Sequence, residues 1–236
     1  MDIYELIGFI IGDGNIYYNT SKRVYRLELV GNVNEDYDYF DEIYKFLIKE
    51  TGRKPLKFIR KEKDSISLRI QFNHKVFVDR LIALGLPKGK KTFTIQIPDN
   101  LLRRDILISI VKGIFEADGC LYFSHSKKGE YPSYPRLEIR SSSPVLVSQI
   151  KSFLKSEGFS VYVKKPSSNK TFSILLSGEK MLNLWINTIG LTSLKNQTKY
   201  NFWKTKGFYI PHTALKQRLD ICGGGTAATA VDFSKE

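Results

Sequence analysis

A nine-residue phrase that occurs twice constrains this chain more than any other feature of its sequence. Residues 6–14 read LIGFIIGDG and residues 111–119 read VKGIFEADG. In both copies an apolar helical run ends in an acidic residue followed by glycine, and the two acids, Asp13 and Asp118, stand 105 positions apart (118 − 13). A chain that repeats this phrase has to place two equivalent carboxylates at the ends of two similar helices.

Other landmarks recur at nearly the same spacing, which indicates that the whole chain is duplicated. The matching pairs are Gly85 and Gly190, Lys90 and Lys195, and, one position further apart, Gly52 and Gly158. We therefore interpret residues 1–98 and 99–215 as two copies of one unit. The Gly- and Ala-rich end of the chain has no periodic apolar face, so residues 216–236 are predicted to form a flexible tail.

Hydrophobic periodicity predicts an α+β fold in which each unit runs helix, two strands, helix, two strands, helix. Helices are expected at 3–13, 35–51, 74–84, 103–118, 144–157, 179–189 and 197–206. Strands are expected at 15–19, 24–31, 120–125 and 134–142, and hairpins at 55–72 and 159–176. Gly14 follows the first helix at the position where a left-handed helix end favours glycine.

The charge balance favours a polyanionic partner. The chain has 236 residues and carries 37 Lys and Arg against 24 Asp and Glu, a net charge of +13. Such a surface attracts nucleic acid, and we find neither an isolated basic amphipathic helix nor an apolar run that suits a membrane. The two cysteines, Cys120 and Cys222, lie in unrelated contexts, so no disulfide framework is expected. The sequence has no zinc-ligand spacing and no nucleotide-binding loop.

The repeated helices carry small residues four positions apart, so that two helix backbones can approach closely. These residues are Gly8 and Gly12 in the first copy and Gly113 and Ala117 in the second. Packing one helix on the other would bring Asp13 and Asp118 together at two helix ends that are themselves partly negative. A divalent cation such as Mg²⁺ would remove this conflict, and without it the pKa of at least one acid should be raised.

With these residues the chain resembles the LAGLIDADG homing endonucleases in their single-chain, two-repeat form. The resemblance implies pseudo-symmetric αββαββα repeats with the two phrase helices at their interface and antiparallel sheets forming a saddle over DNA. It also implies metal ligation by Asp13 and Asp118 with the carbonyls of Gly12 and Ala117. Mg²⁺ is the expected metal, with Mn²⁺ substituting and Ca²⁺ binding without supporting cleavage. Ile11, where the family often has an acid, and Lys112, where it usually has a small residue, depart from the pattern.

The implied activity is hydrolysis of both strands of a long double-stranded DNA target across the minor groove, leaving short 3′ overhangs. The resemblance further implies an intron-encoded monomer in an archaeal cytoplasm or an organelle, since no targeting signal is visible. The family places a basic residue after the last helix of each unit, where Lys90 and Lys195 form the matched pair. Lys91 and Lys199 remain the near alternatives. A polar, water-ordering position corresponds to the strand ends Gly31 and Asn32, and Ser141 and Ser142, from which Gly31 departs.

Basic, aromatic and polar residues alternate with apolar ones along the strands, which places charged side chains on one face of each sheet. Arginine on such a face can read guanine in the major groove, glutamate can accept from cytosine, and lysines can hold phosphates. The expected DNA-binding residues of the first unit are Tyr18, Lys22, Arg23, Tyr25, Arg26, Glu28, Lys57, Arg60, Lys61, Lys63, Arg69 and Gln71. Those of the second are Tyr122, His125, Lys127, Lys128, Tyr134, Arg136, Glu138, Arg140, Lys164, Lys165 and Lys170. The two sets differ, so the target is expected to be asymmetric.

Two other functions use the same scaffold. An RNA maturase would bind the folded intron RNA, and a DNA-binding regulator would bind without cutting, although neither needs both acids. The nuclease insert of an intein is a weaker alternative, because the sequence starts at the first phrase and leaves no room for flanking splicing blocks.

Overall fold

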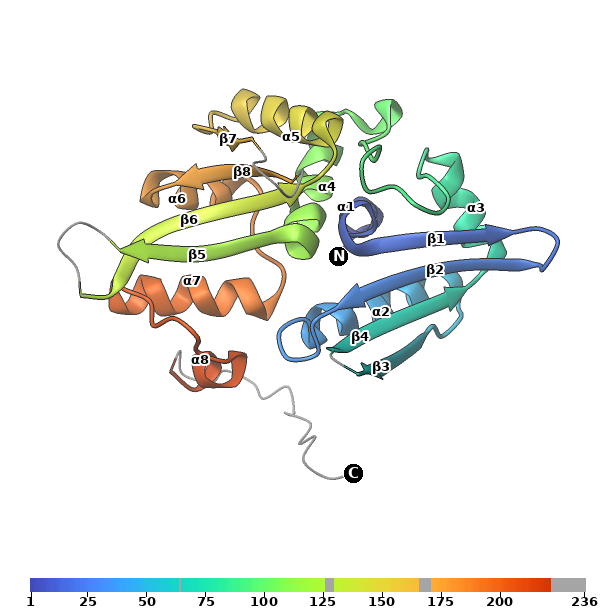
Figure 1. The fold of residues 1–236 in the computed structure, drawn as a ribbon, viewed down its shortest axis with the longest axis horizontal. Coiled ribbons are helices and arrows are strands. Elements are labelled where there is room, and N and C mark those ends of the chain that lie inside the picture. Colours follow the sequence, from blue (N-terminus) through green and yellow to red (C-terminus); the bar gives the residue numbers. More distant parts are fainter. Residues whose placement is uncertain (64, 126–129, 166–170, 222–236) are drawn as a thin grey trace.

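The computed structural model describes residues 1–63, 65–125, 130–165 and 171–221, and over these residues the chain forms two similar α+β units (Figure 1). The first unit consists of α1 (Ile3–Asp13), β1 (Gly14–Asn19), β2 (Val24–Gly31), α2 (Tyr37–Thr51), β3 (Leu56–Glu62), β4 (Ser65–Asn73) and α3 (Lys75–Ala83). A short 3₁₀ turn, η1 (Asp99–Leu101), precedes the second unit. That unit consists of α4 (Arg104–Asp118), β5 (Gly119–His125), β6 (Pro132–Ser141), α5 (Pro144–Ser156), β7 (Tyr162–Lys164), β8 (Phe172–Ser177) and α6 (Glu179–Thr188). Helices α7 (Leu194–Lys206) and α8 (Leu215–Ile221) follow.

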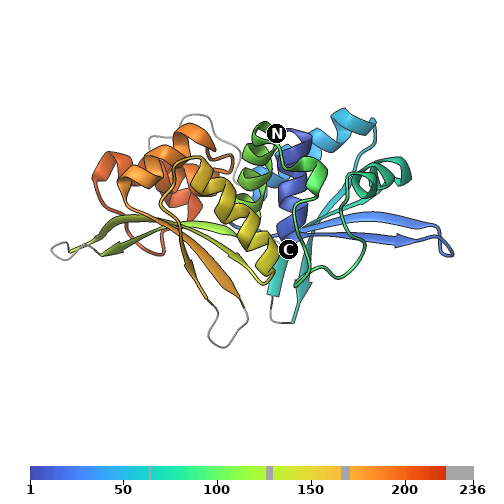
Figure 2. The same ribbon diagram turned by 90° about the horizontal axis from the view of Figure 1, so that it is seen from above.

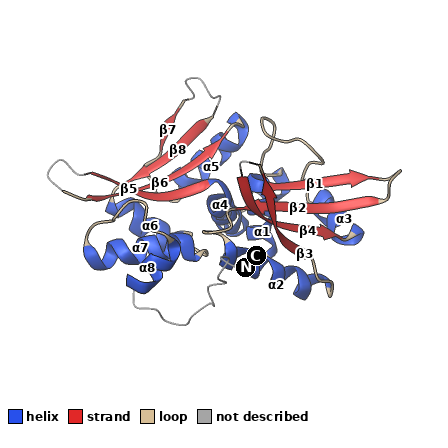
Figure 3. Cartoon of the chain, turned by 60° about the horizontal axis from the view of Figure 1, so that its bottom comes forward, coloured by secondary structure: helices blue, strands red, loops and turns tan. Residues whose placement is uncertain are grey.

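The two sheets have the same topology, which confirms the predicted αββαββα repeat. Their strand orders are β1-β2-β4-β3 and β5-β6-β8-β7, and all pairs are antiparallel. Helices gather on one side of both sheets and the strands on the other (Figure 2). Helices α1 and α4 lie side by side between the two sheets (Figures 1 and 3). No helix of the described residues covers the opposite face of either sheet.

Helix α1 is apolar on nearly every side because both units surround it. Leu6, Ile7, Phe9 and Ile10 are all buried. The side chain of Asp2 accepts a hydrogen bond from the backbone N–H of Glu5 at 2.8 Å and caps the helix. None of the helices in the described part of the chain is long and apolar enough to cross a membrane.

The strand patterns predicted from alternation hold in the structure. In β4, Leu68, Ile70 and Phe72 point into the core, whereas Ile66 lies on the same face but extends beyond the helical cover and is 55% exposed. Gly52 ends α2 with φ 69°, in the left-handed region, as expected for a glycine at a helix end.

Glycine is required at position 14, but the predicted reason, a left-handed helix end, is wrong. Gly14 and its counterpart Gly119 have extended backbones, with φ −95° and −99°, because a strand starts directly at each helix end. A Cβ on Gly14 would lie 2.6 Å from the Cα of Ile10, and one on Gly119 would lie 2.4 Å from the carbonyl oxygen of Phe115. Close approach of the backbone, not a left-handed turn, requires glycine here.

Two predicted boundaries also need correction. Helix α7 begins at Leu194, three residues before the predicted 197, because Ser193 caps it by accepting from the N–H of Asn196 at 3.4 Å. The predicted flexible tail, 216–236, overlaps helix α8, whose Arg218 is buried. Residues 222–236, with Cys222, lie outside the described residues.

Candidate active site

The central helices touch through backbone atoms. A Cβ on Gly8 would lie 2.0 Å from the carbonyl oxygen of Ile110, and one on Gly113 would lie 1.9 Å from that of Glu5. No side chain fits at either position, so the small residues of the repeated phrase form the helix contact, as the sequence predicts.

This contact brings the two acidic ends together. A Cβ on Gly12 would meet the Cβ of Ala117 at 2.5 Å and an Oδ atom of Asp118 at 3.0 Å. The Asp118 carboxylate therefore reaches across the interface to the end of α1, where Asp13 is the last helical residue. Two carboxylates meet at the point where the two sheets adjoin the central helices.

Burial makes ionisation of both carboxylates less favourable. Asp13 opens to solvent on one side, yet the surrounding protein raises its pKa to about 7, and the charge of Asp118 adds to this shift. Burial likewise raises the pKa of Asp118, with Lys91 opposing the change. A raised pKa is what the sequence predicts for this pair without metal.

Lys91, not Lys90, occupies the end of α1. The Lys91 ammonium donates to the backbone carbonyls of Ile10 at 2.7 Å, of Gly12 at 2.8 Å and of Ile11. Burial lowers the pKa of Lys91 to about 8, and the acids Asp118 and Asp13 limit the fall. The Lys90 side chain is exposed. The segment after α3 is thus displaced by one residue from the 105-residue spacing that favoured Lys90.

Lys195 lies at the matching end of α4. Its ammonium donates to Asp36 Oδ1 at 2.7 Å and approaches the carbonyl oxygen of Glu116 at 3.4 Å. Burial alone would lower the pKa of Lys195, but the Asp36 carboxylate outweighs it and the pKa is raised. Lys199, the alternative to Lys195, is held near Cys120 and Arg218, and burial lowers its pKa.

Asp36 and Glu116 are site residues that the sequence did not single out. The Glu116 carboxylate accepts from the N–H of Thr192 at 2.8 Å, the hydroxyl of Ser193 at 2.6 Å and the side-chain amide of Asn196 at 2.9 Å, and so fixes the segment at the start of α7. In the sequence, Asp36 is one of several acidic residues at the start of a predicted helix. Only the fold shows that it faces the other unit. Of the two departures from the family phrase, Lys112 is explained by an ion pair with the buried Glu5 at 3.5 Å.

The open faces of the two sheets carry about half of the expected DNA-binding residues. On the first sheet these are Arg26, Glu28, Arg60, Arg69 and Gln71, and on the second Tyr122, Tyr134, Arg136, Glu138, Arg140 and Lys164. The side chains are ordered by neighbours: Arg69 donates to Glu28 at 2.8 Å. Arg136 donates to the hydroxyls of Ser124 at 3.0 Å and Ser177 at 3.1 Å.

Four expected DNA-binding residues lie on the helix-covered face instead. Side chains along a strand alternate between its two faces, and these four fall on the same face as the buried residues of their strands. Tyr18 and Tyr25 pack against each other with ring centroids 4.9 Å apart. Lys57 pairs with Asp41 of α2 and its ammonium lies 4.0 Å from the ring centroid of Tyr37. The fourth is Lys61, which stands opposite Ile66.

Other positions were missed or lie beyond the strands. Asn15 and Tyr17 are on the open face, and counting alternation from the buried Ile16 would have found them. Lys22, Arg23 and Lys63 lie in turns, His125 ends β5, and Lys165 follows β7. Lys127, Lys128 and Lys170 fall outside the described residues.

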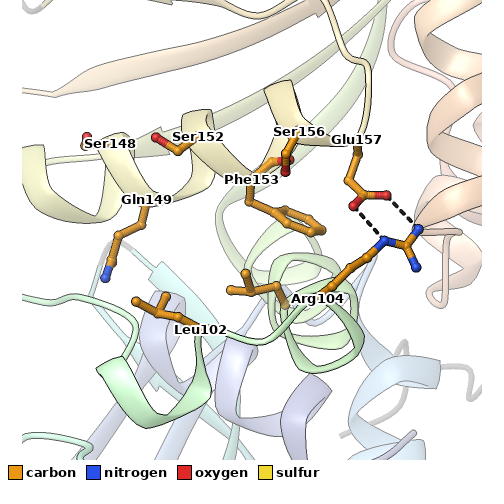
Figure 4. Close-up of a pocket in the computed structure, with 9 residues that line it drawn as sticks. Leu102, Arg104, Ser148, Gln149, Ser152, Phe153, Ser156 and Glu157 are labelled. Atoms are coloured by element: carbon orange, nitrogen blue, oxygen red, sulfur yellow. Dashed lines mark hydrogen bonds and ion pairs between the residues drawn. The ribbon is translucent and has the colours of Figure 1, made fainter.

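The acid pair is distinct from a groove in the surface of the second unit. That groove, about 660 Å³, lies between α4 and α5, with Arg104 and Glu157 paired at its end by two hydrogen bonds of 2.8 Å (Figure 4). Arg104 begins α4 and Asp118 ends it, so the Arg104 end of the groove is about 21 Å from Asp118 along the helix at 1.5 Å per residue. In the described parts of the chain no three His, Cys, Asp or Glu side chains cluster as metal ligands.

Comparison with known proteins identifies the fold. No family model matches the sequence, and no curated protein matches it either. Mesophilic variants of the homing endonuclease I-DmoI superpose with a TM-score of 0.55 at 20% identity, covering 79% of this chain and 93% of theirs. The homing endonuclease I-WcaI bound to its DNA recognition sequence gives 0.55 at 18% identity, covering 80% and 81%.

A complex of I-DmoI with DNA and Mn gives a TM-score of 0.54 at 18% identity, covering 80% of this chain and 96% of that one. Similar I-DmoI structures contain target DNA with Mg, and DNA with Ca. The chain therefore has the two-repeat α+β fold of the LAGLIDADG homing endonucleases, and the resemblance seen in the two phrases is confirmed at the level of fold.

Proposed function

We propose that this protein is a site-specific endonuclease that, as a monomer, hydrolyses both strands of a long, asymmetric double-stranded DNA target with the help of a divalent metal. The observation that carries the proposal is the meeting of Asp13 and Asp118 at the ends of two packed helices, between two open sheet faces. Homing endonucleases of the same fold have been seen bound to DNA.

The open sheet faces suit DNA. Two-stranded ribbons enter the major groove, where Arg26 and Arg136 can contact guanine and Glu28 and Glu138 can accept from cytosine. The net charge of +13 supplies attraction to the phosphate backbone. Because β4 and β8 offer different side chains, the two half-sites should differ in sequence.

The acid pair suits a divalent cation. Carboxylate and carbonyl oxygens are the donors that Mg²⁺ prefers, and burial together with the charge of Asp118 raises the pKa of Asp13, so a cation beside the pair would be favourable. Asp13 and Asp118 would hold the metal with the carbonyls of Gly12 and Ala117, of which the Gly12 carbonyl is shared with Lys91. Mn²⁺ should replace Mg²⁺, whereas Ca²⁺ should bind without supporting cleavage. The metal would supply Lewis-acid stabilisation of the phosphate charge.

The two lysines supply fixed positive charge beside the acids. Lys91 is held by three carbonyls at the end of α1, and Lys195 by Asp36 at the end of α4. Ammonium groups placed in this way stabilise the negative charge that develops on a phosphate during hydrolysis. Because each helix end has one lysine, each lysine would assist the cut in one strand. The two cuts would lie a few nucleotides apart across the minor groove and leave short 3′ overhangs.

The test uses a plasmid that carries the intron-free insertion site of the coding element. With Mg²⁺ the protein should linearise it, while Asp13→Asn and Asp118→Asn should abolish double-strand cleavage and still bind the target. Lys57→Ala, on the helix-covered face, is the matched control and should cut normally. Tight binding to the folded intron RNA without cleavage of DNA in any divalent metal would overturn the proposal.

A further inference from the structure

The two lysines of the active site are held in chemically different ways. Lys91 donates its hydrogen bonds to backbone carbonyls of its own unit. Lys195 forms an ion pair with Asp36 of the other unit, and both side chains are largely shielded, at 15% and 13% exposure. A charge-assisted bond in such surroundings is stronger and more directional than one at the surface.

Asp36 is oriented for this contact and not for capping its own helix. It precedes α2 at the N-cap position, yet its side chain makes no capping bond to the helix. Oδ2 instead accepts from the backbone N–H of Asn32 at 2.7 Å, while Oδ1 accepts from Lys195 at 2.7 Å. With one oxygen tied to its own loop, the carboxylate has little freedom to leave the lysine.

The equivalent residue of the second unit has no charge. Ser143 is the N-cap of α5, and it caps this helix by accepting from the N–H of Leu146 at 3.3 Å. Its hydroxyl also crosses the interface, but it donates to the carbonyl oxygen of Ile95 at 2.6 Å. A single Asp-for-Ser difference between the repeats therefore makes the two ends of the active site unequal.

We propose that Asp36 is a positioning residue that holds the Lys195 ammonium beside the end of α4 and thereby sets the rate of cleavage of one DNA strand only. The inference rests on the proposed function. Loss of Asp36 frees Lys195 from its fixed place, whereas Lys91 and the strand that it serves keep their arrangement.

The first experiment follows both strands of an end-labelled target duplex under single-turnover conditions. Asp36→Asn should slow the same strand as Lys195→Met, by at least about tenfold, and leave the other strand unchanged. The double variant should be no slower than Lys195→Met alone, while combination with Lys91→Met should slow both strands. Asp36→Glu should restore part of the rate.

A matched control variant distinguishes positioning of Lys195 by Asp36 from a general contribution of Asp36 to the stability of the interface between the units. Asp38 also crosses this interface, where its Oδ2 accepts from the backbone N–H of Leu194 at 2.7 Å. Asp38→Asn should lower stability without changing the ratio of the two strand rates. Equal slowing of both strands by Asp36→Asn, or the same strand bias in Asp38→Asn, would contradict the inference.

A second readout needs neither DNA nor metal. The reactivity of Lys195 toward an acylating reagent, measured by mass spectrometry against the exposed Lys90, should rise several-fold in Asp36→Asn. Unchanged reactivity would refute the inference even if the wild type cleaves DNA. If the wild type cleaves no target, both the proposed function and the proposed effect on one strand are refuted. The labelling experiment still shows in that case whether Asp36 restrains Lys195.

Discussion

Single glycines determine how closely the two repeats approach. Gly113 is packed against the backbone of α1, with no room for one additional carbon. The sequence revealed this role because the small residues occur at the same four-residue spacing in both phrases. It could not reveal Asp36 or the choice of Lys91 over Lys90, because both depend on which loop residues from distant segments reach the helix ends.

Gly113→Ala should destabilise the protein strongly, because a Cβ would lie 1.9 Å from the carbonyl oxygen of Glu5 and the two helices would have to separate. We expect a loss of about 3 kcal/mol or more in the free energy of unfolding. Chemical denaturation provides the measurement, with the exposed Val145→Ala in α5 as a control that should change it by less than about 0.5 kcal/mol. A Gly113→Ala variant as stable as the control would exclude backbone contact between α1 and α4.

The raised pKa of Asp13 predicts a pH dependence of stability without metal. The folded carboxyl binds its proton more tightly than the unfolded one, so its contribution is favourable at low pH and is lost as pH rises from about 4 through about 7. The melting temperature of the metal-free protein should fall across this window, and less so for Asp13→Asn. Mg²⁺ should raise the melting temperature more at pH 7.5 than at pH 5, and an equal effect at both would argue against binding at this pair.

At the scale of elements, the sequence predicts every helix and strand of the two units to within a few residues. These predictions fail where the outcome depends on which face of a strand a side chain occupies, or on a contact with a distant segment of the chain. Tyr18 and Tyr25 look suited to DNA, but the register of β1 and β2 turns them toward α3. The sequence predicts a tail where α8 lies, because seven residues beside a Gly-rich segment carry no clear periodicity. The contacts of Arg218 with α7 and with the loop before α2 hold this helix in place.

The assignment of strand faces can be tested with two basic residues on neighbouring strands. Arg69 is on the open face beside Glu28, whereas Lys57 faces α2. Arg69→Ala should relax discrimination at one base pair by about 1–3 kcal/mol, because it removes a candidate base contact. Lys57→Ala should leave discrimination unchanged. Binding to the target and its single-base variants at fixed salt measures both, and the reverse pattern would show that the faces are assigned wrongly.

At the scale of the whole molecule, the two units meet through more than the central helices. Three acids of the first unit, Glu35, Asp36 and Asp38, contact α7 and α8. The second unit contacts the first through a neutral side chain. Gln149 of α5 accepts from the backbone N–H of Ile97 and donates to its carbonyl oxygen, both at 2.9 Å. The pseudo-symmetry of the fold is thus broken in the electrostatics of the interface.

Arg218 should make a large contribution to this interface. It is 1% exposed, pairs with Glu35 at 2.5 Å and donates to Thr198 at 3.0 Å and to the carbonyl of Thr213. Arg218→Ala should cost about 3 kcal/mol in the free energy of unfolding, because it leaves a carboxylate without its partner. The exposed Lys216→Ala in the same helix is the control. Denaturation curves that coincide for the two variants would show that α8 does not join the units.

The distribution of charge at the interface also determines which halves recognise each other. The acids of these two ion pairs come from the first repeat and their cationic partners from α7 and α8, so the contact has a direction, unlike the self-complementary surface of a symmetric dimer. Two copies of the first repeat would set carboxylates where ammonium and guanidinium groups are needed, and like charges would discourage their pairing. A duplicated chain whose halves have diverged in this way favours pairing of its first half with its second over pairing of two first halves.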